Sequence, residues 1–318
     1  MSDHKLIVSP SPHVRGQDST QRIMLDVLLA LCPAVAASVV LFGVRALLVE
    51  VLCMATCVAA EYVTRRVLRR SNTIGDLSAA VTGLILALNL PVTINPIFAM
   101  IGCVVAIVIV KQLFGGIGQN FLNPAGAARV VLLVSFPAAM SRWVAPFFYR
   151  TSSLADAVTT ATPLAQSTEE MPSYLQLFLG VHGGCMGETC ALALLIGFVY
   201  LLVRRVISPV IPLTCMGTVA VFTLLLGDNP ITALLSGGVM FAAIFMATDY
   251  TTSPITPAGR WVFGIGVGLI TVFIRQFGVL DEGASYALVL MNVLVPHIER
   301  LTRPKAFGVV KTKGGKSA

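Results

Sequence analysis

Apolar residues dominate this chain in long runs that short polar segments separate. A helix needs ~20 apolar residues to cross the ~30 Å hydrocarbon layer of a bilayer, and fewer where it is shielded by protein. The sequence predicts ten such helices, at about 23–44, 46–64, 76–90, 96–114, 125–145, 188–203, 209–227, 230–248, 261–280 and 284–298. Glycine and proline interrupt several of them, as is common near sites inside membrane proteins. The pattern therefore predicts an all-α polytopic membrane protein.

The composition favours a membrane protein over a water-soluble one. Of the 318 residues, 56% are hydrophobic and only 12% are charged, whereas soluble domains average ~25% charged residues. Too few charges remain to cover the surface of a soluble fold of this length. The first twenty residues are polar and contain no apolar run, so we expect no cleavable signal peptide.

Basic side chains predict the orientation of the chain. If the N-terminus lies inside, the outer side holds Arg45, Arg142, Arg150 and Arg275, and the other Lys and Arg residues, including Arg129, fall on the inner side. An excess of Lys and Arg marks cytoplasmic loops. We therefore expect both termini in the cytoplasm, and the net charge of +7 indicates inner loops rather than binding to nucleic acid.

The two groups of five predicted spans resemble each other. Residues 79–83 (AAVTG) match 233–237 (ALLSG), 108–115 (VIVKQLFG) match 272–278 (VFIRQFG), and 126–128 (GAA) match 283–285 (GAS). An odd number of crossings in each repeat makes the halves antiparallel, so we predict two inverted five-helix repeats in a urea-channel-like arrangement. Lys111 and Arg275 occupy matching positions, and each is expected to extend to its own membrane interface.

This organisation divides the chain into five segments. They are an N-terminal segment (1–22), a first repeat (23–145), a long outer loop (146–187), a second repeat (188–300) and a basic cytoplasmic tail (301–318). The outer loop is rich in Ser and Thr and has one basic residue. Long loops in compact proteins are commonly functional or disordered, which makes this loop the first place to look for a site.

The outer loop contains the sequence DAVTTATP at 156–163. Asp156 can accept hydrogen bonds from the backbone of a turn. Hydroxyl side chains follow at Thr159, Thr160 and Thr162, and Pro163 biases Thr162 toward an extended conformation. Composition alone favours a hydrophilic capped turn here.

Together with other segments, this motif resembles a known family, that of the D subunit of the Rnf ion-translocating oxidoreductase complex and the related B subunit of the sodium-translocating NADH:quinone reductase. Family members have a motif D-x-x-[ST]-x-A-[ST]. Further matching segments lie at 11–13 (SPH), 76–83 (DLSAAVTG), 90–91 (LP), 111–120 (KQLFGGIGQN), 123–125 (NPA), 187–189 (GET) and 245–254 (FMATDYTTSP). One departure is Cys190, where the family pattern has Ser. The resemblance covers roughly residues 10–300.

The resemblance implies a cofactor and its attachment point. In the family, the last hydroxyl residue of the motif carries FMN through a phosphoester bond, which corresponds to Thr162 here. A separate flavin transferase makes this bond, and Asp156, Thr159 and Thr160 would serve as its recognition elements or would stabilise the turn. The expected location is the bacterial inner membrane, with the flavin loop outside.

The resemblance also implies a function and a set of partners. The chain would relay electrons in a multi-subunit complex that links ferredoxin and NAD to Na⁺ or H⁺ transport. Its partners would be other membrane subunits, a second flavinylated subunit and iron–sulfur subunits. The alternative is a stand-alone secondary transporter or channel, because inverted repeats also build such proteins. A channel has no need of a flavin-attachment motif.

The inner loop that follows Lys111, at 114–125 (FGGIGQNFLNPA), has two interpretations. Its glycines and asparagines favour a tight re-entrant turn packed against the helices. Alternatively, it contacts partner subunits or a second, non-covalent flavin such as riboflavin.

Some ionisable and sulfur-containing side chains lie within or near the predicted spans. The acidic residues are Asp26, Glu50, Glu61, Asp76, Glu188, Asp228 and Asp249. Charges at membrane depth are costly, and most of these residues lie near predicted span ends, so we expect interfacial caps; Asp76 is the best candidate for an ion pathway. Cys185 and Cys190 lack further nearby metal ligands, so a disulfide or two free thiols remain open and no metal site is predicted.

Overall fold

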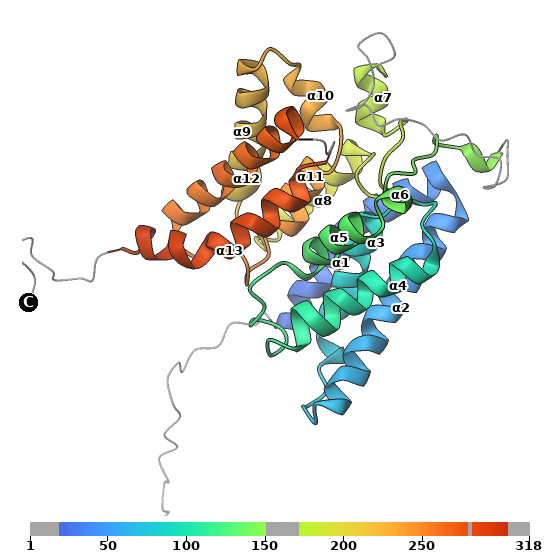
Figure 1. Ribbon diagram of the computed structural model, residues 1–318, viewed down its shortest axis with the longest axis vertical. Helices are drawn as coiled ribbons and strands as arrows, with labels where there is room; N and C mark the ends of the chain where they lie inside the picture. Colours follow the sequence, from blue (N-terminus) through green and yellow to red (C-terminus); the bar gives the residue numbers. More distant parts are fainter. Residues whose placement is uncertain (1–18, 151–171, 279–281, 305–318) are drawn as a thin grey trace, which may run out of the picture.

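The computed structural model describes residues 19–150, 172–278 and 282–304 (Figure 1). The regular elements of this part of the chain are helices. The first are α1 (Thr20–Phe42), α2 (Val44–Val67), η1 (Ile74–Asp76), α3 (Ser78–Leu88), α4 (Pro96–Val104), η2 (Val105–Gln112), α5 (Pro124–Ser135), α6 (Pro137–Met140) and η3 (Phe148–Arg150). The others are α7 (Tyr174–Leu179), α8 (Ala191–Val203), α9 (Val210–Leu225), α10 (Pro230–Leu235), α11 (Val239–Phe241), η4 (Ala242–Met246), α12 (Pro257–Phe277) and α13 (Ala284–Thr302). The predicted all-α architecture is confirmed.

Three of the described helices, α1, α2 and α12, are long and apolar enough to cross a membrane. Shorter apolar helices accompany them: α3, α4 with its continuation η2, α5, α8 and α9. The segments η2 and η4 are π-helices, a geometry that is rare and frequently found at functional sites.

Asparagine or threonine followed by proline starts four of the helices. The side chains of Asn95, Asn123 and Asn229 accept hydrogen bonds from the first turns of α4, α5 and α10, and Thr256 does the same for α12. These caps satisfy backbone donors that have no partner within the helix. The proline that follows each cap has no N–H group to leave unpaired, so the local sequence fixes these four starts.

Two predicted spans are shorter or less continuous than expected. The span predicted at 125–145 ends as α5 at Ser135, because Pro137 starts a separate short helix, α6. The span predicted at 230–248 is broken between α10 and α11, where Gly237 has a φ of +67°. A side chain at Gly238 would collide with the Glu188 carboxylate, since an added Cβ would overlap its Oε1. The break between α10 and α11 therefore leaves room for the Glu188 carboxylate beside Gly238.

The helices form two groups that lie beside each other (Figure 1). In one group, α2 packs against α3 and α4; in the other, α12 packs against α9 and α13. The contacts α1–α8 and α5–α13 join the groups. Each joining contact pairs a helix of the first half with one of the second, so the interior between the halves is shared by both.

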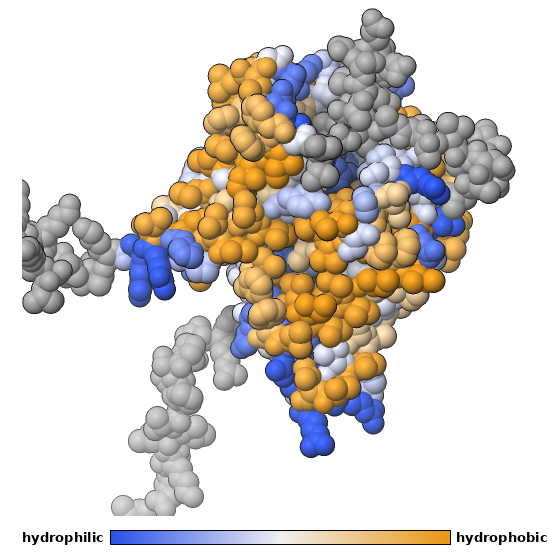
Figure 2. Space-filling view, viewed as in Figure 1, coloured by the Kyte–Doolittle hydropathy of each residue, from blue (hydrophilic) through white to orange (hydrophobic). Residues whose placement is uncertain are grey.

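The outside of the helix bundle is largely apolar. Figure 2 shows hydrophobic residues over much of the visible face and hydrophilic ones at the lower tip, past the end of α2. Large apolar side chains are exposed on the long helices, for example Leu48 of α2 and Phe273 of α12. Apolar exposure on this scale is a liability in water and is the expected surface of helices that face lipid.

Candidate functional site

A cavity of about 420 Å³ lies between the two helix groups. Its apolar wall comes from α1, α3, α8 and η4 and includes Ile23, Ile85 and Phe245. Its polar wall comes from the ends of η2 and η4 and the loops that follow them: Lys111, Asn120, Asn123, Thr248 and Asp249. Small-molecule sites typically have this combination of a few polar groups on a mainly apolar surface, in a volume of ~300–1,000 Å³. The cavity is therefore a candidate ligand site.

Lys111 anchors the polar wall through a buried network. Its Nζ donates to Glu61 Oε2 (2.9 Å) and to Ser78 Oγ (2.6 Å). Glu61 Oε1 also accepts from the side chains of Gln112 (2.8 Å) and Thr73 (2.9 Å). Lys111 is only 3% exposed and Glu61 is fully buried. The expectations that Lys111 reaches the membrane interface and that Glu61 is an interfacial cap are both wrong, because each charge is neutralised by the other inside the protein.

The polar wall also includes residues of the second half, Thr248 and Asp249. Asn123 Nδ2 donates to the Met246 carbonyl (3.0 Å), which ties the start of α5 to the end of η4. Asp249 accepts a hydrogen bond from Thr252 Oγ1 (3.1 Å). Burial raises the pKa of the Asp249 carboxyl above its ordinary value, and this exceeds the opposing effect of its hydrogen bonds and of Lys111. The polar wall thus combines a lysine with a carboxyl group whose protonated form is favoured by burial.

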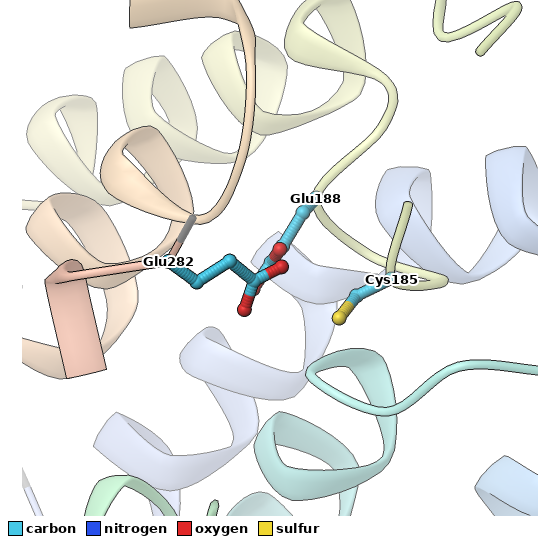
Figure 3. A group of neighbouring side chains, drawn as sticks. All are labelled: Cys185, Glu188 and Glu282. Carbon is cyan, nitrogen blue, oxygen red and sulfur yellow. The ribbon is translucent and has the colours of Figure 1, made fainter. Parts of the chain in front are cut away.

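A second polar cluster lies in the interior at the meeting of the two halves. Cys185, Glu188 and Glu282 have ligand-type atoms within 4.8 Å of one another (Figure 3). The guanidinium of Arg129, which is 1% exposed, donates to both carboxylates, and its Nη2 lies 3.2 Å from Cys185 Sγ. Its Nη1 also donates to the Asn89 side chain. The cation that these groups share is therefore a guanidinium, which a metal ion would have to displace.

The cluster fixes the last residues of the long loop predicted at 146–187. The backbone N–H groups of Met186 and Gly187 donate to the carbonyls of Leu90 (3.1 Å) and Leu88 (2.8 Å). This brings Cys185 and Glu188 alongside the end of α3. Cys185 Sγ donates to the Asn89 carbonyl (3.1 Å). Residues 185–188 therefore lie inside the helix bundle before α8 begins.

The remaining thiol and acidic residues also have defined positions. Cys185 and Cys190 are separate free thiols, the first buried and the second partly buried. Asp76 accepts from the backbone N–H of Ser78 (2.9 Å), as expected for a cap. Asp26 pairs with Arg204 (3.2 Å).

The predicted flavin-site residues Asp156, Thr159, Thr160 and Thr162 lie outside the described residues, within 151–171. The segments on either side of them are anchored. Before the gap, Tyr149 donates to the Val40 carbonyl (3.0 Å) at the end of α1. After it, α7 begins with a reciprocal Ser173–Gln176 cap, and Asn229 donates to the Tyr174 hydroxyl (2.5 Å). Both flanks are thus held against helix ends.

Sequence reasoning missed Arg129 as an interior residue. The positive-inside pattern predicts it at the inner side of the membrane, yet it is completely buried and joins Glu188 and Glu282, which are distant in sequence. The available signal was a single charged residue inside the apolar run of 125–135, and such residues are functional-site candidates by default. The expectation of interfacial caps is also wrong for Glu50 and Glu188, since both are buried.

Apolar helices with two buried charge networks and a cavity between helix groups define an integral membrane protein with a polar site in its interior. Residues 7–308 match the NQR2, RnfD, RnfE family, and the chain belongs to this family. The resemblance that the sequence motifs indicated is therefore confirmed.

Individual relatives match over nearly their full length. The D subunit of the Na(+)-translocating ferredoxin:NAD(+) oxidoreductase complex of Acetobacterium woodii is 48% identical, over 98% of this chain and 98% of the relative. The D subunit of the proton-translocating ferredoxin:NAD(+) oxidoreductase complex of Clostridium ljungdahlii is 38% identical, over 95% and 96%. The D subunit of the ion-translocating oxidoreductase complex of Stutzerimonas stutzeri is 38% identical, over 92% and 93%.

Proposed function

We propose that this chain is the D subunit of an ion-translocating ferredoxin:NAD⁺ oxidoreductase complex and that it carries FMN covalently on Thr162. The observation that carries the proposal is the D-x-x-[ST]-x-A-[ST] motif at 156–162 in a chain that belongs to this family over residues 7–308. The near-complete match to three D subunits supports it. The chain would act with the other members of the complex and would have no complete activity alone.

Several contacts support the inverted repeat, with its halves at 23–145 and 188–300. Lys111 and Arg275 stand at matching positions of the two halves. Lys111 contacts Ser78 at the start of α3, and Arg275 donates to the carbonyls of Ala233 (2.8 Å) and Ser236 (3.2 Å) in the matching segment around α10. The pairs α1–α8 and α5–α13, which a two-fold axis would exchange, are in contact.

Hydrogen bonds at the two ends of α2 show which inter-helix connections lie at the same end of the bundle, and they support the predicted topology. Arg45 Nε donates to the Val92 carbonyl (2.8 Å), joining the α1–α2 and α3–α4 connections. At the other end of α2, Arg70 donates to the Gln112 carbonyl (2.9 Å). Arg65, Arg66, Arg69 and Arg70 lie at this second end. We infer that it faces the cytoplasm with both termini, and that the flavin loop faces the outside of the bacterial inner membrane.

The cavity is the proposed site of a second, non-covalent flavin such as riboflavin. Its mainly apolar wall suits a flat ring system, and Lys111, Asn120 and Asp249 supply donors and acceptors for the polar edge and side chain. The chemistry of one- and two-electron transfer belongs to the flavin when it is bound. The protein's own residues would hold the ring and keep bulk water away from it.

The FMN proposal is tested by in-gel flavin fluorescence after denaturing electrophoresis, with the protein made in a host that has the flavin transferase. Thr162→Ala should abolish the fluorescence, because no other atom would carry the phosphoester. Thr160→Ala is the matched control and should keep at least part of it. Fluorescence that persists in Thr162→Ala would move the attachment point elsewhere. A non-fluorescent wild-type chain would favour the stand-alone transporter or channel.

The second flavin is tested by denaturing the purified protein and measuring the flavin released. Thr82→Trp places an indole at the cavity wall and should remove releasable flavin while leaving covalent fluorescence intact. Val262→Trp, at a 48% exposed position on the outer face of α12, is the control. Equal release from both variants would contradict the proposed site.

A further inference from the structure

Glu50 is a buried carboxyl group that forms no ion pair with the residues that the structure describes. It lies on α2, six residues after Val44, which places it ~9 Å along the helix axis from the start of α2. Both Glu50 and its neighbour Ser38 on α1 are 0% exposed. The Glu50 Oε2 atom has no hydrogen-bond partner among the described residues. This acid therefore differs from the other buried glutamates.

The other two buried glutamates named above each have a basic residue as a partner. Glu61 accepts from the Lys111 ammonium, and Glu188 accepts from the Arg129 guanidinium. Within the described parts of the chain, the one side-chain hydrogen-bond partner of Glu50 is the hydroxyl of Ser38, at 2.6 Å from Oε1. Two thiols lie on this side of α2: Cys53 is one turn along the helix from Glu50, and Cys103 Sγ of α4 donates to the Cys53 carbonyl (3.6 Å). None of these groups offers a positive charge.

The number of hydrogens available for these contacts indicates whether the Glu50 carboxyl is protonated. A serine hydroxyl has one hydrogen to donate, and Ser38 Oγ lies within hydrogen-bond distance of two acceptor-type atoms, the Val35 carbonyl (2.8 Å) and Glu50 Oε1. If Ser38 donates to Val35, the hydrogen between Ser38 and Glu50 must come from Glu50. If Ser38 instead donates to Glu50, an ionised carboxylate keeps a single hydrogen bond in apolar surroundings, which is far too costly.

We propose that Glu50 and Ser38 form a proton-binding site at the α1–α2 interface, in which Glu50 is a neutral carboxylic acid that donates to Ser38. The ligand of this site is a proton rather than a metal cation, because the groups identified around Glu50 do not supply the several oxygen ligands that Na⁺ requires. The site does not depend on whether Thr162 carries a flavin.

A hydrophobic carbodiimide tests the proposal in the intact complex in membranes, because such reagents add to protonated carboxyl groups in apolar surroundings. Mass spectrometry of the peptides should find the adduct on Glu50 at neutral pH. Glu61 is the matched control, since it lies on the same helix but is paired with Lys111, and it should remain unmodified. Glu50→Gln should lose the adduct and fold normally, because the amide can also donate to Ser38.

Infrared difference spectroscopy between wild type and Glu50→Gln provides a readout that does not require the reagent to reach the site. The wild type should show the carbonyl stretch of a protonated carboxylic acid, and the variant should lack it. If this band is absent from the wild type, Glu50 is ionised and the proposal is overturned. Loss of the band on adding Na⁺ at constant pH would also overturn it, since the ligand would then be sodium.

Discussion

The Lys111 network beside the cavity and the Arg129 cluster between the halves both bury a basic residue with acids, but they differ in how the cation is held. Lys111 has a compact ammonium at the wall of a 420 Å³ cavity, with Glu61 and Ser78 as partners from its own half. Arg129 uses both ends of a planar guanidinium to join Glu188 and Glu282 of the other half. An ammonium on a flexible stem can change partners, whereas a guanidinium fork is fixed by geometry.

This difference suggests a division of labour. The Arg129 cluster holds the two halves and the end of the outer loop together, since Glu188 precedes α8 and Glu282 precedes α13. The Lys111 network leaves an ammonium at a surface where a ligand can reach it. We therefore expect loss of Arg129 to damage the assembly of the fold, and loss of Lys111 to affect chiefly the cavity.

The largest effect is expected for Arg129→Gln. The substitution leaves Glu188 and Glu282 buried without their cation, and breaking a buried charge pair in this way costs about 3–5 kcal/mol. The protein should express poorly or melt at a much lower temperature in detergent. Arg142→Gln, at an exposed position, is the control and should behave as wild type. Wild-type melting of Arg129→Gln would show that the two halves do not depend on this cluster.

A smaller effect is expected for Lys111→Met. Glu61 keeps its hydrogen bonds from Thr73 and Gln112 and a second cation, Arg65, whose Nε lies 3.9 Å from Glu61 Oε1. We therefore expect a loss of about 1–3 kcal/mol, below that of a buried carboxylate left without any cation. The double variant Lys111→Met/Glu61→Gln should recover part of this loss, because it removes both charges. Melting temperatures and releasable flavin are measured together. Loss of stability as large as that of Arg129→Gln would remove the distinction between the two networks.

The smallest effect concerns the pH dependence of stability in the segment between α7 and α8. Burial lowers the pKa of His182 from 6.5 to about 4. An unfolded chain therefore binds a proton at this histidine below pH 6.5, while the folded chain does not until about pH 4, so stability falls as the pH drops through this window. The loss is about 1.4 kcal/mol per pH unit.

Melting temperatures at pH 7 and pH 5 check this dependence. His182→Gln should flatten it, and His297→Gln, at an exposed position on α13, should leave it unchanged. If both variants keep the wild-type dependence, protonation of His182 is not the cause of the loss of stability at acid pH.

Much of the fold could be predicted from local patterns. Apolar runs identified the apolar helices, three of which are long enough to cross a membrane. The Asn–Pro and Thr–Pro pairs at four helix starts are a further local signal, which the prediction of spans from apolar runs did not use. The family was recognised from short motifs. The break at Ser236–Gly238 was visible as a small-residue stretch, but periodicity treats it as part of a span, because glycine is common in membrane helices.

The sequence by itself determined the class of protein, its helices and its family, because apolar run length, helix caps and motif spacing are local properties. Only the tertiary structure decided which charges are buried and with what. Arg129 and Glu282 are 153 residues apart, and nothing in the run around Arg129 distinguishes a snorkelling cation from one buried between two carboxylates. The free energy of a charge in a membrane protein depends on the groups that surround it, and folding alone brings those groups together.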